Sequence, residues 1–224
     1  MSKHTHSDEK LMTAYYKAVD FFEANKKHVY TALTIIVIAV AGIIFLVNRN
    51  KANNENAGVA LSQINRAYSN NDFQQAINGD SLGNIKGLQY IVDEYGSTEN
   101  GQAAKLMLAN CYYALRDFDK AEKYYKDFSG SNIILKASAL AGEASVSEAK
   151  QKYSDAAKQY EKAASVDPAN PFVDQYMFYA AKNYVRANEN DKAKTIFDKI
   201  KKDYPKSKFV AESERYKALI NNAN

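Results

Sequence analysis

Side chains that commonly do chemistry are few in this chain and lie far apart. The three histidines, His4, His6 and His28, all fall within the first 28 residues. Residues 29–224 therefore contain no imidazole that could act as a general acid, a general base or a metal ligand. The sequence also lacks a glycine-rich phosphate loop and a DxDxDG calcium loop. These residue types favour a protein that is not an enzyme and holds no metal or cofactor.

The remaining reactive groups fit structural roles. The acidic pair Asp93–Glu94 is expected on ordinary helix surface, and Cys111, within LANCYY, is expected as a small buried apolar residue. A single cysteine excludes an internal disulfide and a CxxC motif. Lysines gather at the end of a predicted helix, where cations are favoured, at Lys199, Lys201, Lys202, Lys206 and Lys208. Because the formal charge of +4 is mild and mixed with acids, no nucleic-acid partner is expected.

An apolar stretch near the start predicts a membrane span. Residues Val29–Val47 carry no charge and, as a helix, would cover about 28 Å, close to the thickness of a bilayer's hydrocarbon core. A cleaved signal peptide is the alternative, because Ala39–Ala41 resembles a small-x-small cleavage site. Against it, 28 residues including acids precede the stretch, which continues past that site. We therefore expect one transmembrane helix.

The basic residues beside this stretch predict its orientation. Five precede it and three follow within about 20 residues; they are Lys3, Lys10, Lys17, Lys26 and Lys27, then Arg49, Lys51 and Arg66. This bias favours a cytoplasmic N-terminus. In a bacterium with two membranes, the chain would be a single-pass inner-membrane protein with a periplasmic C-terminal domain.

The segments that flank the span each leave two readings open. In the cytoplasmic arm, residues 1–28, one helical face carries Leu11, Tyr15, Ala18, Val19 and Phe22. The arm either lies along the membrane interface or is a simple helical lead-in to the span. Residues 48–56 are polar and form either a short linker or an outward continuation of the membrane helix.

One helical pattern recurs three times after the span. Ala121, Ala156 and Ala193 are separated by 35 and 37 residues, and an aromatic follows each after four residues, at Tyr125, Tyr160 and Phe197. Another alanine precedes each by twelve residues, at Ala109, Ala144 and Ala181. Pro168 and Pro205 end the second and third units. Small residues at these places let two helices cross closely, and aromatics fill the gap beside them.

This is the pattern of the tetratricopeptide repeat (TPR), in which each unit is a pair of antiparallel helices. It predicts an all-α chain with a right-handed α-solenoid of about three to four helix pairs, since each pair must bury its apolar face against the next. The expected bounds are 57–101 for a degenerate first unit interrupted by the loop NGDSLGN, 102–205 for three TPR units, and 206–224 for a C-terminal capping helix.

The first helices of the pairs are expected to line a concave, protein-binding groove. Repeat position places these residues on it: Leu106, Asn110, Tyr113, Ala141, Ser145, Glu148, Gln175, Phe178, Lys182 and Arg186. Apolar side chains would anchor a polypeptide, and the cations would meet its acidic groups.

The layout as a whole resembles the family of ancillary SecYEG translocon subunits (YfgM-like). The resemblance lies in VDFFEANKK directly before a single span, followed by a polar stub, a broken first repeat and about three TPR units. It implies a periplasmic domain that acts at the Sec channel in protein export, on exported polypeptides and beside a membrane-anchored, prolyl-isomerase-like chaperone. The alternative is a TPR scaffold of another envelope assembly, in outer-membrane biogenesis, secretion or motility.

Overall fold

The computed structural model of the chain describes residues 4–222. Within this range the chain forms ten α-helices and no strand, which confirms the prediction of an all-α fold. The helices are α1 (His4–Ser69), α2 (Phe73–Asn78), α3 (Leu88–Tyr95), α4 (Glu99–Ala114), α5 (Phe118–Lys126), α6 (Ile133–Ala149), α7 (Tyr153–Ser165), α8 (Val173–Arg186), α9 (Asn190–Asp203) and α10 (Val210–Asn222). The chain divides into two compact units, residues 1–50 and 51–224.

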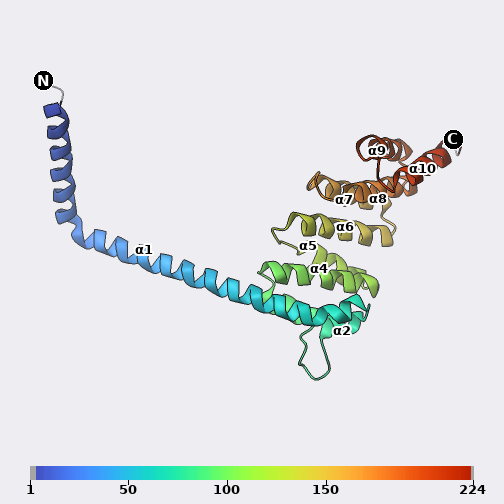
Figure 1. Cartoon of the computed structure of the whole chain (residues 1–224), viewed down its shortest axis with the longest axis horizontal. Helices are drawn as coiled ribbons and strands as arrows, with labels where there is room; N and C mark the ends of the chain where they lie inside the picture. The colour runs from blue at the N-terminus through green and yellow to red at the C-terminus, as the bar shows by residue number, and fades with distance from the viewer. Residues whose placement is uncertain (1–3, 223–224) are drawn as a thin grey trace. The chain divides into compact units, whose positions relative to one another are not determined.

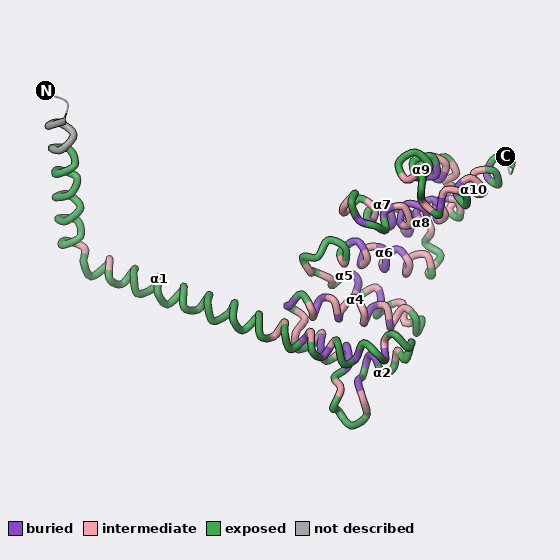
Figure 2. Tube along the Cα trace, viewed as in Figure 1, coloured by how far each residue is buried: buried purple, intermediate pink, exposed green. Residues whose placement is uncertain are grey.

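Within the described residues, the first unit consists of the part of α1 that ends at Asn50. This helix contains a stretch long and apolar enough to cross a membrane, and none of that stretch is buried within the chain. Figure 2 shows the same part of α1 exposed along its length. A core helix of a soluble domain would instead be mostly buried. Residues 48–56 continue the helix outward and do not form a separate linker, because α1 runs through them without a break.

The second unit is a stack of helix pairs. Pairs α4/α5, α6/α7 and α8/α9 follow one another, each packed on the next, and α10 packs on α9 and α8 at the end, as a capping helix should (Figure 1). The end of α1 packs in one apolar cluster with α2, α3 and α4 through Ile64, Ile77 and Leu88. Figure 2 shows the buried residues concentrated between these layers.

The recurring alanines lie where the helices of the stack cross. All six are fully buried: Ala109, Ala121, Ala144, Ala156, Ala181 and Ala193. The aromatic four residues after each second-helix alanine is buried as well, with Tyr125 and Tyr160 4% exposed and Phe197 0%. Larger side chains at the alanine positions would overpack the contact at a cost of about 1–3 kcal/mol. The sequence pattern thus marks the core of each pair.

The turn inside each pair repeats as closely as the core does. Asn71, Arg116, Gln151 and Asn188 each have φ near +60° and stand at the same place between first and second helix. Around Arg116, the amide of Asp117 donates to the carbonyl of Tyr112 and the amide of Arg116 to that of Tyr113, which is the Schellman pattern. The other three turns have the same two bonds. Since Asn71 follows α1, the end of α1 and α2 form a pair of the same kind.

A loop replaces most of the second helix in that first pair. α2 ends at Asn78, and the next residue, Gly79, has a φ of +86°. The chain returns through a single antiparallel bridge between Gly79 and Lys86. A Cβ on Gly87 would lie 2.2 Å from the carbonyl oxygen of Ile77, so only glycine fits this close approach. Helix resumes at α3. The loop Gly79–Gly87 therefore lies at the break that NGDSLGN predicts.

Candidate functional site

The ten groove positions lie on α4, α6 and α8, and three of them are buried. Leu106, Ala141 and Phe178 are 8%, 9% and 2% exposed and belong to the apolar core. The ring of Phe178 stacks on that of Phe209, with centroids 4.8 Å apart. These three side chains support the face from beneath and do not present a surface to a partner. Their placement on an open groove is therefore corrected, because neighbouring helices cover them.

Two further positions hold the helix pairs together. The amide of Asn110 donates to the hydroxyl of Tyr68 (2.9 Å), and its Oδ1 accepts from the hydroxyl of Tyr125 (2.6 Å). One repeat later, the hydroxyls of Ser145 and Tyr160 lie 2.8 Å apart. Burial raises the pKa of Tyr125 and of Tyr160, so the hydroxyls of these two residues stay protonated. In the pairs α4/α5 and α6/α7, the polar residue after the first-helix alanine is thus a partner for the aromatic of its own pair.

Glu148 and Arg186 meet across the joint between the second and third pairs. A guanidinium nitrogen of Arg186 lies 2.7 Å from the Glu148 carboxylate, and the guanidinium also lies 4.1 Å from the ring centroid of Tyr153. The amide of Asn183 donates to the same carboxylate (3.0 Å). Burial, and then the charge of Glu148, raise the pKa of Tyr113. The predicted positions Glu148 and Arg186, from two successive pairs, therefore come together, and Tyr113 of the pair before them lies within range of the Glu148 charge.

The remaining two positions surround Tyr179. The ammonium of Lys182 lies 5.7 Å from the centre of the Tyr179 ring, and Gln175 donates to its hydroxyl (3.4 Å). The Tyr179 ring also contacts that of Tyr160, with centroids 5.5 Å apart. Tyr179 is half-buried and was not among the expected residues. Repeat position gives no signal for it, since the equivalent residues in the earlier units are Met107 and Gly142.

The partly exposed residues of this surface form one mixed patch, here called the inner face: Asn110, Tyr113, Ser145, Glu148, Gln175, Tyr179, Lys182 and Arg186. The two cations of the inner face, Arg186 and Lys182, differ in the groups that they contact. Arg186 is paired with Glu148, whereas Lys182 contacts only aromatic rings among the described residues. Lys182 is therefore the cation of the inner face that is available to an acidic group of a partner.

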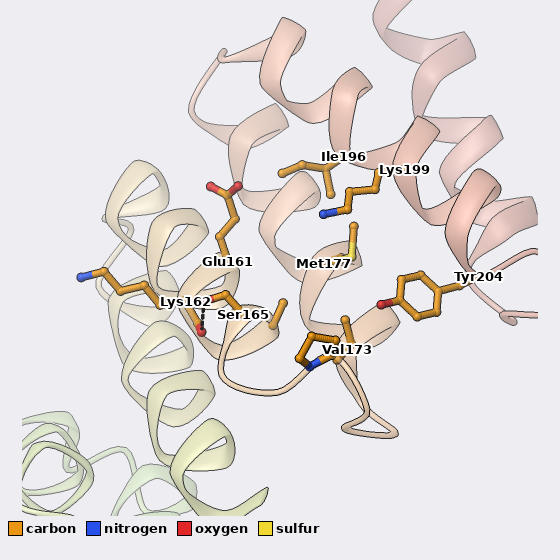
Figure 3. A pocket seen from close by; sticks show the side chains of 10 residues that line it. Glu161, Lys162, Ser165, Val173, Met177, Ile196, Lys199 and Tyr204 are labelled. Atoms are coloured by element: carbon orange, nitrogen blue, oxygen red, sulfur yellow. Dashed lines mark hydrogen bonds between the residues drawn. The ribbon is translucent and has the colours of Figure 1, made fainter. Parts of the chain in front are cut away.

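A separate recess of about 580 Å³ lies between α7, α8 and α9 (Figure 3). Its apolar floor consists of Val173, Met177 and Ile196, which are 4%, 6% and 8% exposed. Lys199 and Tyr204 point into it from the rim, and Lys199 has no ion-pair partner within the described part of the chain. None of the ten predicted positions lines it. It offers an apolar hollow lined also by the charged residues Glu161, Lys162 and Lys199.

One match to a catalytic motif runs against the expectation that the sequence contains no GxSxG. Residues Gly79–Gly83 read GDSLG and match the GxSxG spacing of hydrolase nucleophiles. In those enzymes the serine stands on a sharp turn between a strand and a helix, with a histidine beside it. Ser81 lies instead on the exposed loop between α2 and α3, in a unit whose sequence contains no histidine. The match therefore lacks the strand–turn–helix setting of those nucleophiles.

The described residues offer no metal centre either. No group of three or more His, Cys, Asp or Glu side chains among them could hold an ion. The side chains of His4 and His6 lie outside the part that is described. Cys111 is fully buried, and burial raises the pKa of its thiol to about 12, so the thiol stays protonated and unreactive at neutral pH.

Comparison with known proteins supports the repeat assignment. The family model described as tetratricopeptide repeat matches residues 103–129 and 175–207, which cover α4/α5 and α8/α9. Residues 130–174 fall outside both matches, yet α6/α7 has the same buried alanines and the same turn at Gln151. No curated protein matches the chain significantly. The chain thus carries tetratricopeptide repeats, a helix-pair module through which proteins bind other proteins.

Proposed function

We propose that this chain is a membrane-anchored, non-catalytic module that holds a polypeptide on the inner face of its repeats. The observation that carries this proposal is the continuity of the inner face over three successive pairs, from Tyr113 through Glu148 to Lys182 and Arg186. Tyrosine rings offer apolar contact at low entropic cost, and Lys182 offers a charge without an acidic partner of its own. A polypeptide with acidic residues beside apolar ones fits this surface best.

The anchor in this proposal is the apolar stretch of α1. Its length, its lack of charge and the fact that none of it is buried within the chain support a span, and the excess of lysines before it supports a cytoplasmic N-terminus. The repeats would then stand in the periplasm of a bacterial inner-membrane protein. At that place the module could meet polypeptides as they leave the membrane.

The finer role that we propose is an ancillary subunit of the Sec translocon. The resemblance of VDFFEANKK and the single span to such subunits supports it. The partners would be the SecYEG channel, a periplasmic prolyl-isomerase-like chaperone and exported polypeptides. A scaffold of another envelope assembly is the second candidate, because the same inner face would serve one folded partner equally well.

A photo-crosslinking experiment separates these roles. A photoreactive amino acid replaces Tyr113 or Lys182 in the full-length protein, and native membranes are irradiated before partners are identified by mass spectrometry. The control places the same amino acid at Lys158, an exposed residue of α7. We expect Sec-channel subunits and varied exported polypeptides from the two inner-face positions. A single envelope complex without Sec subunits would instead indicate the scaffold, and equal adducts from Lys158 would overturn binding at the inner face.

A further inference from the structure

The N-terminal part of α1 carries an uncovered apolar face of its own. Nine apolar side chains lie between Leu11 and Phe22, and at about 100° per residue they cover an arc of roughly 220° around the helix. Leu11, Tyr15 and Phe21 are 66%, 64% and 66% exposed. The opposite side carries Lys10, Thr13, Lys17, Asp20 and Lys27. This two-faced pattern differs from the following stretch, which is apolar all round.

The helix bends where the two patterns meet. The rings of Phe22 and Tyr30 touch edge to face, with centroids 5.8 Å apart, although eight residues of straight helix would separate their Cα atoms by about 12 Å. Between them, the side-chain amide of Asn25 donates to the carbonyl of Phe21 (2.9 Å), a local bond of the type that accompanies helix bending. Figure 1 shows α1 changing direction between its N-terminal part and the long segment that follows.

The apolar face lies on the inner side of the bend. A ring contact between Phe22 and Tyr30 can close only on the inner side of the bend, and Phe22 lies near the centre of the apolar arc. If the long segment crosses a bilayer, the inner side of a bend at its end faces the bilayer surface. The apolar arc therefore points toward lipid, and the polar side points toward water.

We propose that residues 9–25 form an interfacial helix that lies on the cytoplasmic surface of the bilayer and binds its lipids. The proposal rests on the proposed membrane span. Three lysines have no acidic partner among the described residues and suit anionic head groups: Lys17 on the polar side, and Lys26 and Lys27 at the bend. Tyrosine and phenylalanine, which make up four of the nine apolar side chains, favour the head-group region.

Depth-dependent quenching of a fluorescent label tests this placement. The full-length protein, with Cys111→Ser, receives one of three substitutions: Tyr15→Cys on the apolar side, Thr13→Cys on the polar side, or Ile38→Cys in the middle of the span. Each is labelled with an environment-sensitive dye and placed in vesicles of phosphatidylethanolamine and phosphatidylglycerol. We expect doxyl-labelled lipid to quench the labels at Tyr15→Cys and Ile38→Cys, and aqueous iodide to quench only the label at Thr13→Cys.

The three positions separate the possible failures. If iodide quenches the labels at Tyr15→Cys and Thr13→Cys equally while the label at Ile38→Cys is lipid-quenched, the span stands and the interfacial helix is refuted. If the label at Ile38→Cys is not quenched by lipid, the proposed span itself fails. If the label at Tyr15→Cys is protected only at high protein-to-lipid ratio, a second copy of the chain covers the face, which also overturns the proposal.

A further substitution tests the bend. Asn25→Ala removes the side-chain bond to the Phe21 carbonyl and should reduce lipid quenching of the label at Tyr15→Cys. The matched control is Thr31→Ala, which removes a similar side-chain bond inside the apolar stretch and should reduce this quenching less.

Discussion

The hydroxyl of Tyr125 donates to Oδ1 of Asn110 at 2.6 Å, and this bond joins the two helices of the first complete pair. Asn110 also donates to Tyr68, so one amide connects two neighbouring pairs. Asn110 therefore links neighbouring helix pairs in addition to forming part of the surface of the inner face.

Removing that hydroxyl should loosen the stack. We expect Tyr125→Phe to lower the free energy of unfolding by about 1–2 kcal/mol, because the Asn110 carbonyl would lose its donor in a half-buried place. For a unit of this size the unfolding temperature would fall by roughly 2–8 °C. Circular dichroism of the detergent-solubilised full chain measures it. In Tyr160→Phe the Ser145 hydroxyl keeps its bond to the Ala141 carbonyl, so a smaller fall is expected there. An unchanged Tyr125→Phe protein would show that the bond contributes nothing to stability.

Gly142 should not tolerate even one added carbon. A Cβ built on it would lie 2.2 Å from Cε1 of Tyr125, whose ring is buried and whose hydroxyl is held by Asn110. Glycine to alanine in a helix ordinarily stabilises by up to about 1 kcal/mol. Here we expect Gly142→Ala to destabilise by about 1–3 kcal/mol, because the contact is overpacked. The sign of the change, measured by thermal unfolding, decides the point.

A double variant shows whether the Tyr125 ring is the cause. Added to Tyr125→Leu, the substitution Gly142→Ala should cost little, since the smaller side chain leaves room for the new methyl group. An equal cost in both backgrounds would mean that another contact is responsible.

The turn at Gln151 should become more stable with glycine. Its φ of +60° strains any residue that has a Cβ, and its side chain is exposed in the turn. We expect Gln151→Gly to raise the free energy of unfolding by about 0.5–1 kcal/mol. Gln151→Ala, which keeps the strain, is the matched control and should not show this gain. If the two variants unfold at the same temperature, the left-handed turn is not strained.

The single thiol should resist labelling while the protein is folded. Burial raises the pKa of Cys111 to about 12, above its unfolded value near 8.5. A raised pKa means that the group's contribution to stability is complete below about pH 8.5 and declines as the pH rises toward 12. A maleimide should therefore react with Cys111 at pH 7 only after urea is added. The control is the variant Asp155→Cys, which keeps Cys111. Maleimide should label its substituted, exposed position 155 at once without urea. Labelling of Cys111 at a similar rate in native protein would contradict the buried placement.

The repeat pattern predicted the core of each pair well, for a physical reason. Every unit must present the same two faces to its neighbours, so Ala109 and Ala121 recur as Ala144 and Ala156, and all are buried. The assignment of surface positions failed at one place in every unit. Leu106, Ala141 and Phe178 each stand three residues before the first-helix alanine, and all three are buried. This position therefore belongs to the core that the units share, and at the end of the stack Phe209, just before α10, also packs on Phe178.

The polar contacts between units could not be read from the sequence either. The pairs Asn110–Tyr68 and Glu148–Arg186 join residues 42 and 38 positions apart. Neither distance equals one repeat, and neither pair recurs in another unit. Periodicity identifies positions that all units share, whereas these contacts distinguish one joint from the next. These contacts, and the place of Tyr179, therefore had to come from the structure, whereas repeat position predicted the other residues of the inner face.

Lys182 should matter most for capture of a partner. Its ammonium lies over the rings of Tyr179 and Phe178 and has no acidic partner among the described residues, so it is free to meet a carboxylate. We expect Lys182→Glu to weaken capture at the inner face by about five-fold, equivalent to about 1 kcal/mol, because the attraction becomes repulsion. The yield of crosslinks from a photoreactive amino acid at Tyr113 measures it. Lys158→Glu makes the same change of charge on an exposed part of α7 and should leave that yield unchanged. An equal loss in both variants would mean that net charge, and not the inner face, governs capture.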